Sequence, residues 1–117
     1  MSHYIHKLIA QGEHQTLDFK YQITDSKKIA RTLSAFANTD GGTLLIGVKD
    51  NGKVAGVRSE EEYFMIEAAS KMYTKPAVPF SVQKHLVETK IVLEFKVPKC
   101  EKLPYLAPTR NEQWRAF

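Results

Sequence analysis

A helical pattern that leads directly into a buried strand constrains the fold of this chain more than any other feature. From Ile29 to Ala37 the apolar side chains recur at intervals of three and four residues, which places them on one face of an α-helix. Thr24, Asp25 and Ser26 are candidate N-caps for this helix. The run "TLLIGV" at residues 43–48 is typical of a central strand covered on both faces. This order of elements predicts helices packed against a sheet.

Gly41 and Gly42 stand between the predicted helix and strand, where a glycine-rich loop raises the question of phosphate binding. In phosphate-binding loops a strand comes first and a helix follows, because the helix N-terminus presents free N–H groups to the anion. Here the helix comes first, so its terminal carbonyl groups are nearest and repel a phosphate. The motif G-x-x-x-x-G-K-[ST] is also absent from the sequence. We predict that the glycines end the helix in a left-handed conformation and that the loop binds no ATP.

Shorter patterns predict the elements on either side of this unit. Residues 3–11 have apolar side chains at helical spacing, and residues 15–20 alternate as in a half-buried strand. Asn51 and Gly52 predict a type I′ turn, because this pair tolerates positive φ at both central positions. The returning strand of that turn is expected over residues 54–57.

The second half of the chain predicts one more helix and a hairpin. Ser59, with Glu62 three residues later, forms a candidate capping box at the start of a helix over residues 59–73. Two β-rich runs between residues 78 and 98 predict an antiparallel hairpin around Glu88.

The predicted element order is helix, strand, helix, strand, strand, helix, strand, strand. It indicates an α/β fold of the mixed α+β type, with a compact mixed sheet and flanking helices. A chain of 117 residues has the length of one ordinary domain, so residues 1–117 are expected to form a single domain. Residues 104–117 are expected to be an extended tail or the start of a further element, and Trp114 and Phe117 indicate either a longer chain or a dimer contact.

The charge balance favours a polyanionic partner. Lys and Arg exceed Asp and Glu by four, and the pI of about 9.2 points to nucleic acid before a membrane surface. No apolar stretch approaches the roughly 20 residues of a membrane helix, and the first residues lack the apolar core of a signal peptide. We therefore expect a cytoplasmic protein with no membrane partner. Cys100 is the only cysteine, which excludes an internal disulfide and a zinc site built on paired cysteines.

Three carboxylates are the candidates for chemistry. Asp18 faces outward from its predicted strand beside Lys20, and Asp50 follows the buried strand. If the two strands run parallel, their carboxyl ends share one edge of the sheet, where these three side chains could meet. Glu13 is separated from Asp18 by roughly 16 Å of extended chain and joins them only if the chain bends just after it. Clustered carboxylates would suit Mg²⁺ or Mn²⁺, which can activate water against a phosphodiester.

Each acid also has a simpler interpretation. Glu13 can be a solvated loop acid, and Asp18 can pair with Lys20 without any further role. Asp50 opens an Asp-Asn-Gly turn, a position where turn chemistry alone selects aspartate. Both interpretations remain open on the sequence alone.

Basic residues gather in the same part of the sequence. They fall in or near the strand–helix–strand unit and the turn after it: Lys20, Lys27, Lys28, Arg31, Lys49 and Lys53. A surface that contacts the phosphate backbone explains this clustering and predicts salt-dependent binding. A solvated polar helix face explains the helical members equally well. The four histidines form no ligand set and are expected at the surface: His3, His6, His14 and His85.

The stretches "GEHQTLDFK" and "KIARTLSAFANTDGGTLLIGVKDNGKVAGV" resemble the Schlafen AlbA-type domain family. The later "PFSVQKHLVETKIVLEFKVP" and "KLPYLAP" resemble its closing hairpin and tail more loosely. The resemblance implies an α/β fold that pairs into dimers. Bacterial members are described as DNA-binding or transcriptional-regulator modules. An older label for the family invokes ATP, but in this sequence the helix precedes the glycine pair, which opposes phosphate binding there.

In vertebrate Schlafens the domain is similar to a metal-dependent endoribonuclease that acts on structured RNA. The resemblance implies that Glu13, Asp18 and Asp50 correspond to its three acids. Asp18 stands where the family usually has glutamate, which is one methylene longer. The Schlafen zinc site is missing, as a single cysteine requires.

Three hypotheses about function follow. The first is a nucleic-acid-binding domain, the DNA-binding module of a homodimeric transcriptional regulator, which contacts phosphates through the six basic residues and needs no cofactor. The second is an endoribonuclease in which Glu13, Asp18 and Asp50 hold Mg²⁺ or Mn²⁺ while Lys20 steadies the phosphate. The third is a dimerisation scaffold without catalysis.

Overall fold

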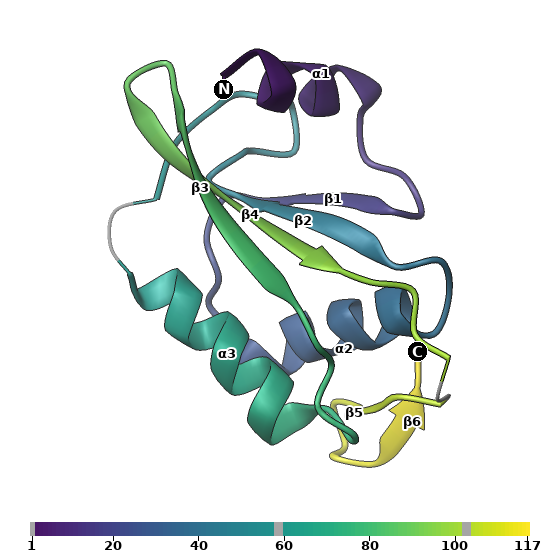
Figure 1. The fold of residues 1–117 in the computed structure, drawn as a ribbon. Coiled ribbons are helices and arrows are strands. Elements are labelled where there is room, and N and C mark those ends of the chain that lie inside the picture. Colours follow the sequence, from purple (N-terminus) through teal and green to yellow (C-terminus); the bar gives the residue numbers. More distant parts are fainter. Residues whose placement is uncertain (1, 58–59, 102–103) are drawn as a thin grey trace.

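The computed structural model of the chain describes residues 2–57, 60–101 and 104–117 (Figure 1). This part contains three helices and six strands, and the predicted mixed α/β fold is confirmed. None of these helices is long and apolar enough to cross a membrane. In chain order the elements are α1 (Ser2–Gln11), β1 (Leu17–Lys20), α2 (Ser26–Ala37), β2 (Gly42–Ile46), α3 (Glu61–Tyr73), β3 (Ser81–Val87), β4 (Lys90–Val97), β5 (Leu106–Pro108) and β6 (Trp114–Ala116).

Four strands form one mixed sheet in the order β1-β2-β4-β3. β1 and β2 are parallel, with Asp18 opposite Leu44 and Lys20 opposite Ile46. β4 is antiparallel to both of its neighbours. Helix α2 is the crossover between the two parallel strands, so the parallel arrangement considered from the sequence is confirmed. β1 and β3 are the two edges of the sheet.

Apolar side chains cover both faces of this sheet. On one face α2 and α3 pack over a core that includes Leu33, Leu44 and Phe95. On the other face α1 packs over a smaller core that includes Ile5 and Phe19. Figure 1 shows α1 on the opposite side of the sheet from α2 and α3. Strand β2 is covered on both sides, which explains its uninterrupted apolar sequence.

The connection from α2 to β2 explains the glycine pair. Of the three candidate N-caps, Asp25 caps the start of α2 by accepting two backbone N–H groups of the first turn. Gly41 has the expected left-handed conformation, with a φ of +81°, and its N–H donates to the carbonyl of Phe36 at 2.8 Å. Gly42 lacks a positive φ, but a Cβ there would lie 2.3 Å from the Phe36 ring. The glycines therefore shape the backbone between helix and sheet.

The predicted returning strand over residues 54–57 is wrong. Both edges of β2 are occupied, by β1 and β4, so no position is left for a hairpin partner. Among the described residues only an isolated bridge between Val48 and Val54 remains of it. Val57 instead donates its N–H to the carbonyl of Ile91 in β4, at 2.8 Å.

The turn before this segment is also of a different type. A type I′ turn needs positive φ at both Asn51 and Gly52, and only Gly52 has it, with a φ of +86°. The N–H of Gly52 donates to the carbonyl of Lys49 at 2.8 Å, and the N–H of Lys49 donates to the carbonyl of Lys53 at 2.9 Å. Asp50 therefore lies in the centre of the turn, exposed to solvent.

The hairpin predicted around Glu88 is confirmed. β3 and β4 are joined by Glu88 and Thr89, which have φ values of +52° and +66°. Helix α3 begins at Glu61, and the side chain of Glu60 at its N-cap position makes no capping hydrogen bond. The predicted capping residue Ser59 lies outside the described residues.

Residues 104–117 form a further element rather than an extended tail. β5 and β6 pair in antiparallel fashion around a turn in which the N–H of Thr109 donates to the carbonyl of Gln113 at 2.7 Å. The hydroxyl of Ser34 in α2 donates to the carbonyl of Tyr105 at 2.7 Å and ties the start of this hairpin to the helix. The predicted element order therefore lacks these two strands, because their short apolar runs pair only once α2 supports them.

Candidate functional site

The free edge of β1 brings two of the predicted acids together. A tight turn over residues 14–17, closed by backbone hydrogen bonds of 2.9 and 3.0 Å, reverses the chain after α1. Glu13 thereby returns to β1, where its carboxylate accepts the N–H of Phe19 at 3.0 Å. Asp18 shares a hydrogen bond with Glu13 and lies 3.4 Å from the ammonium group of Lys20. The chain therefore bends just after Glu13, which was the condition for Glu13 to join Asp18.

The contact between the two carboxyl groups drives their pKa values apart. Burial, and then the hydrogen bond with Glu13, raises the pKa of Asp18 from 3.8 to about 6, against the lowering effect of Lys20. The same hydrogen bond, together with the N–H of Phe19, lowers the pKa of Glu13. The pair therefore holds one proton until the pH reaches about 6. A carboxyl group of this kind can exchange a proton near neutral pH, as a general acid or base does.

Asp50 does not join this pair. Its exposed side chain makes no hydrogen bond or ion pair with any described residue. Within the described ranges, no group of three or more His, Cys, Asp or Glu side chains is placed to hold a metal ion. The assembled donors are the two carboxylates of Glu13 and Asp18, and a backbone N–H and an ammonium group already contact them. As they lie, these residues do not fit Mg²⁺ or Mn²⁺, which need more oxygen ligands.

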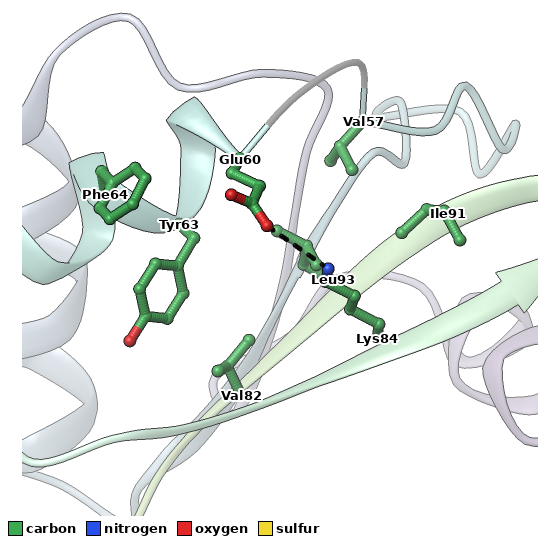
Figure 2. Close-up of a pocket in the computed structure, with 8 residues that line it drawn as sticks. All are labelled: Val57, Glu60, Tyr63, Phe64, Val82, Lys84, Ile91 and Leu93. Carbon is green, nitrogen blue, oxygen red and sulfur yellow. Dashed lines mark ion pairs between the residues drawn. The ribbon is translucent and has the colours of Figure 1, made fainter.

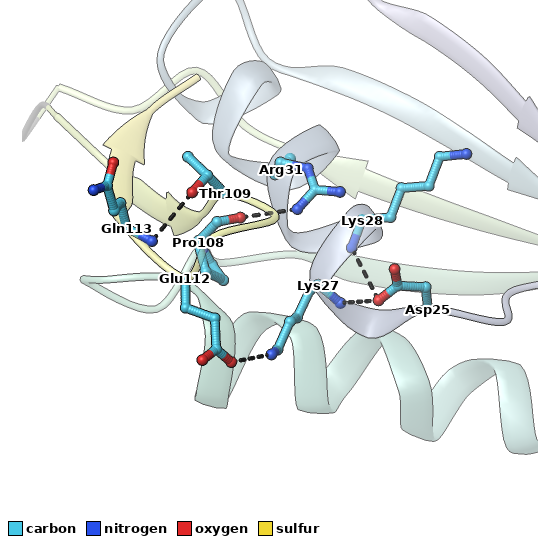
Figure 3. A network of polar contacts seen from close by, with 8 residues as sticks. All are labelled: Asp25, Lys27, Lys28, Arg31, Pro108, Thr109, Glu112 and Gln113. Carbon is cyan, nitrogen blue, oxygen red and sulfur yellow. Dashed lines mark hydrogen bonds and ion pairs between the residues drawn. The ribbon is translucent and has the colours of Figure 1, made fainter.

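Two of the predicted basic residues hold the C-terminal hairpin against α2 (Figure 3). Lys27 forms an ion pair with Glu112 at 2.6 Å, and the guanidinium of Arg31 donates to the carbonyl of Pro108 at 2.9 Å. The hydrogen bond with Glu112 raises the pKa of Lys27 and so favours its charged form. The charge of Lys27 is thus already paired. Arg31 has further N–H groups besides the one that it donates to Pro108.

The other predicted basic residues lie on the same helix or near the end of β1. Lys20 pairs with Asp18, and the ammonium of Lys49 lies 5.4 Å from the centre of the Tyr21 ring. The side chains of Lys28 and Lys53 form no hydrogen bond or ion pair with the described residues. Their charges are available to a ligand.

A basic cleft lies between α2 and the turn that joins β5 to β6. Its volume is about 620 Å³, and the described side chains that line it include three cations and two hydroxyls but no Asp or Glu. The Phe117 ring also lines it and is 39% exposed. The name basic cleft is used below for the hollow lined by Lys28, Arg31, Thr32, Thr109, Arg110 and Phe117.

A second hollow, between α3 and the sheet, is apolar (Figure 2). Its volume is about 550 Å³, and it is lined mainly by Val57, Tyr63, Phe64, Val82, Ile91 and Leu93. Its two charged residues, Glu60 and Lys84, form an ion pair at 3.8 Å. Their charges offset each other, so this groove offers little to a polyanion.

A buried polar cluster on the α1 face of the sheet was not foreseen from the sequence. Glu94 in β4 is 2% exposed, and its carboxyl group accepts a hydrogen bond from the hydroxyl of Tyr4. Nε2 of His85 lies 2.9 Å from the same carboxyl group, and the ammonium of Lys96 lies 3.8 Å away. Burial and the hydrogen bond to Glu94 raise the pKa of Tyr4. The surface position expected for His85 is wrong, since only 5% of it is exposed.

The sequence does contain a signal that brings His85 and Glu94 together. The two-residue turn after β3 fixes the register of the hairpin, and that register places His85 and Glu94 on the same face of the sheet. The polar run between β5 and β6 likewise predicts a turn that exposes Arg110. Nothing in the local sequence, however, predicts that this turn lies beside α2.

Comparison with known proteins agrees with this architecture. The model of the Schlafen AlbA_2 family matches residues 13–115. The chain belongs to this family. The matched range of the Schlafen AlbA_2 domain includes the Glu13–Asp18 pair and the lining of the basic cleft except Phe117.

Two solved structures resemble this Schlafen AlbA_2 domain. One is the solution structure of the N-terminal domain of a Nitrosomonas europaea protein described as related to the ATP-dependent DNA helicase RecG. It has 22% identity and a TM-score of 0.63, and the match covers 98% of this chain and 80% of that chain. The DIP2311 protein from Corynebacterium diphtheriae has 19% identity and a TM-score of 0.66, and the match covers 97% of this chain and 27% of that one. At these identities the likeness shows the fold.

Proposed function

We propose that this Schlafen AlbA_2 domain binds nucleic acid, as the DNA-binding module of a cytoplasmic transcriptional regulator. The observation that carries the proposal is the basic cleft, where the side chains of Lys28, Arg31 and Arg110 surround one hollow and no described Asp or Glu side chain lines it. Cations that line a hollow without counter-charges attract polyanions, since the neighbouring charges add to one field. The description of a structural neighbour as related to a DNA helicase supports the same class of ligand.

Binding of this kind predicts a steep dependence on salt. Each phosphate that is neutralised releases counterions, so the affinity for duplex DNA or RNA should fall by orders of magnitude as salt rises from about 50 to 200 mM. A Lys28→Gln, Arg110→Gln double variant removes two cations, and we expect the salt slope to fall by about 1 for each phosphate contact that is lost. Fluorescence anisotropy of a labelled duplex across a salt series measures both effects.

Lys7 supplies the matched control for this experiment. It is exposed on α1, on the opposite side of the sheet from α2 (Figure 1). Lys7→Gln removes one positive charge and the double variant removes two, so a general loss of positive charge would cost Lys7→Gln about half the binding free energy that the double variant loses. We expect Lys7→Gln to bind as the wild type does. An affinity that does not change with salt would contradict the proposal.

A homodimer is part of the same proposal. The family resemblance implies a fold that pairs into dimers, which supports this part of the proposal, and a two-fold arrangement would let one nucleic acid contact two basic clefts. Sedimentation velocity over a range of protein concentrations tests it. A single species of monomer mass at every concentration would contradict the dimer without affecting the proposal of nucleic-acid binding.

The Glu13–Asp18 pair supports a second candidate function, cleavage of structured RNA. Because the pKa of Asp18 is about 6, its carboxylate can accept the proton of a ribose 2′-hydroxyl near neutral pH. The 2′-oxygen then bonds to phosphorus, and the 5′-oxygen leaves with a proton from water. In this mechanism Lys20, whose ammonium lies 3.4 Å from the Asp18 carboxylate, would contact the phosphate.

This second function is tested by measuring cleavage of a structured RNA by the wild type and by the variants Asp18→Asn and Asp50→Ala. We expect Asp18→Asn to abolish cleavage, whereas Asp50→Ala should retain it because Asp50 lies apart from the pair. The reactions are run in Mn²⁺ and again in a chelator. Equal cleavage by the wild type and Asp18→Asn would exclude Asp18 from the mechanism, and loss of activity in Asp50→Ala would show that the third acid is required.

A further inference from the structure

The basic cleft combines cations with an aromatic ring that has no partner in the part of the chain that the structure describes. Phe117 is 39% exposed, and its ring stacks on no other ring or cation of the described residues. Trp114, in the same hairpin, is covered by the ammonium of Lys75, which lies 4.2 Å from the centre of its ring. Phe117, which directly follows β6, therefore differs from Trp114 in that no described ring or cation covers it.

The polar groups of the cleft retain capacity for a ligand. Arg31 donates one N–H to the carbonyl of Pro108, and a guanidinium carries five N–H donors. The hydroxyl of Thr109 accepts the N–H of Gln113 at 3.1 Å, and its own proton remains to be donated. The side chains of Lys28 and Arg110 form no hydrogen bond or ion pair with the described residues. Several donors thus surround the hollow, which suits an anion with several oxygen atoms.

We propose that the basic cleft binds one nucleotide of a single-stranded nucleic acid, with its phosphate between the cations and its base stacked on Phe117. The volume of about 620 Å³ lies within the range of small-molecule pockets, which is roughly 300–1,000 Å³. Stacking requires a base whose face is exposed, and bases inside a duplex are covered by their neighbours. This inference rests on the proposed nucleic-acid binding and deepens it by naming unpaired strands as the preferred ligand.

The basic cleft and the apolar groove between α3 and the sheet differ in charge, and this inference depends on that difference. The apolar groove also has an exposed aromatic side chain, Phe64, which is 57% exposed, but its charges are paired. The basic cleft has the aromatic ring and unpaired cations together. An acidic peptide would use the cations of the cleft and would gain little from the ring. An affinity that falls when the bases are removed therefore distinguishes a nucleic-acid ligand from an acidic peptide.

The test compares Phe117→Leu with Phe64→Leu. Both substitutions remove an exposed ring and keep an apolar side chain, and only the first touches the basic cleft. The ligands are labelled single strands of about 12 nucleotides, as DNA and as RNA, and the corresponding DNA duplex. We expect Phe117→Leu to bind single strands about tenfold more weakly with an unchanged salt slope, because one stacked base is lost and no phosphate contact changes. Phe64→Leu should match the wild type.

A change in the ligand gives the same answer without a substitution in the protein. A single strand in which consecutive nucleotides are abasic keeps its phosphates and loses its bases, and we expect the wild type to bind it about tenfold more weakly. Two results would overturn this inference and leave salt-dependent binding intact. One is that the wild type binds the abasic strand as tightly as the normal strand, and the other is that Phe117→Leu binds single strands as tightly as the wild type does. Failure of the wild type to bind any of these ligands at low salt would instead overturn the proposed function. Circular dichroism and urea unfolding of both variants establish that they are folded.

Discussion

Asp18 and Glu94 are acids on strands of the same sheet, but their surroundings differ. Glu94 lies on an interior strand and is 2% exposed, and its carboxyl group contacts the hydroxyl of Tyr4 and the imidazole of His85. Asp18 lies on an edge strand with a side chain that is 23% exposed, and its nearest carboxyl neighbour is Glu13. One acid is surrounded by hydrogen-bonding partners, whereas the other shares its site with a second acid.

This difference distinguishes a structural acid from a candidate reactive one. A buried carboxyl group with partners on α1 and β3 holds these elements together, and it loses its partners if they separate. Two adjacent carboxyl groups lower stability once both are charged, so one of them keeps its proton to a higher pH. Perturbed carboxyl groups of the second kind are concentrated at functional sites. The comparison predicts opposite effects on stability when each acid is replaced.

The largest effect is expected for Glu94→Leu. The substitution leaves His85 buried without a partner for Nε2 and removes the acceptor for the hydroxyl of Tyr4. We expect a loss of about 3 kcal/mol in the free energy of unfolding, the usual cost of breaking a buried polar pair. Urea unfolding at neutral pH measures it. Stability equal to that of the wild type would mean that the buried cluster does not stabilise the fold.

Glu88→Gln is the matched control for that variant. Glu88 also pairs with a histidine, His6, at 2.8 Å, but the two side chains are 55% and 48% exposed. Exposed ion pairs contribute about 0–1 kcal/mol, so this substitution should change stability little. Equal losses in the two variants would show that burial does not set the contribution of these pairs.

The second effect is a gain in stability for Asp18→Asn that depends on pH. Because the pKa of Asp18 rises on folding from 3.8 to about 6, this group favours the folded state most at low pH. Its contribution is lost as the pH rises from about 4 to about 6, since the unfolded chain then loses its proton more easily. Asparagine does not titrate, so the advantage of the variant should grow over this window to about 1–2 kcal/mol, the lowered pKa of Glu13 offsetting part of the effect.

Thermal or urea unfolding of both chains at several pH values between about 4 and 7 measures this difference. Asp50→Asn serves as a control, because the exposed Asp50 side chain has no hydrogen-bonding partner among the described residues. A constant difference between Asp18→Asn and the wild type across the window would show that Asp18 and Glu13 do not share a proton.

The smallest effect is expected for Tyr4→Phe. This substitution removes only the hydroxyl that donates to Glu94 and leaves His85 in place. A single hydrogen bond contributes about 1 kcal/mol, and we expect a loss of that size in urea unfolding. Tyr21→Phe removes a hydroxyl that has no hydrogen bond with the described residues and should be neutral. A similar loss in both variants would indicate that the contact with Glu94 adds nothing.

Local patterns in the sequence predicted much of the fold. The apolar stripe of α2 and its N-cap depend on neighbours within one or two helical turns. The stripe was predicted correctly, and Asp25 was one of the three predicted candidates for the cap. The hairpin turn at Glu88 and the left-handed Gly41 follow from equally local preferences. The parallel pairing of β1 with β2 was only a condition at the sequence level, and the structure shows it.

The candidate site was predicted less completely, because its parts are distant in the sequence. Glu13 reaches Asp18 through a turn whose sequence gave no strong signal, whereas Asp50 lies on a turn that leads away from them. The strand over residues 54–57 was predicted from its composition, but β4 already occupied the edge of β2 that it needed. Arg110 was overlooked because its importance depends on its position beside α2.

The sequence by itself determined the elements, their caps and the excess of positive charge, since these depend on neighbouring residues or on composition. Only the tertiary structure decided which charges remain unpaired and which acids meet. Lys27 and Lys28 are adjacent in the sequence, yet Lys27 is paired with Glu112 from the C-terminal hairpin while Lys28 lines the basic cleft. Such pairings depend on distances between segments that are far apart in the chain, and packing of the whole core sets those distances.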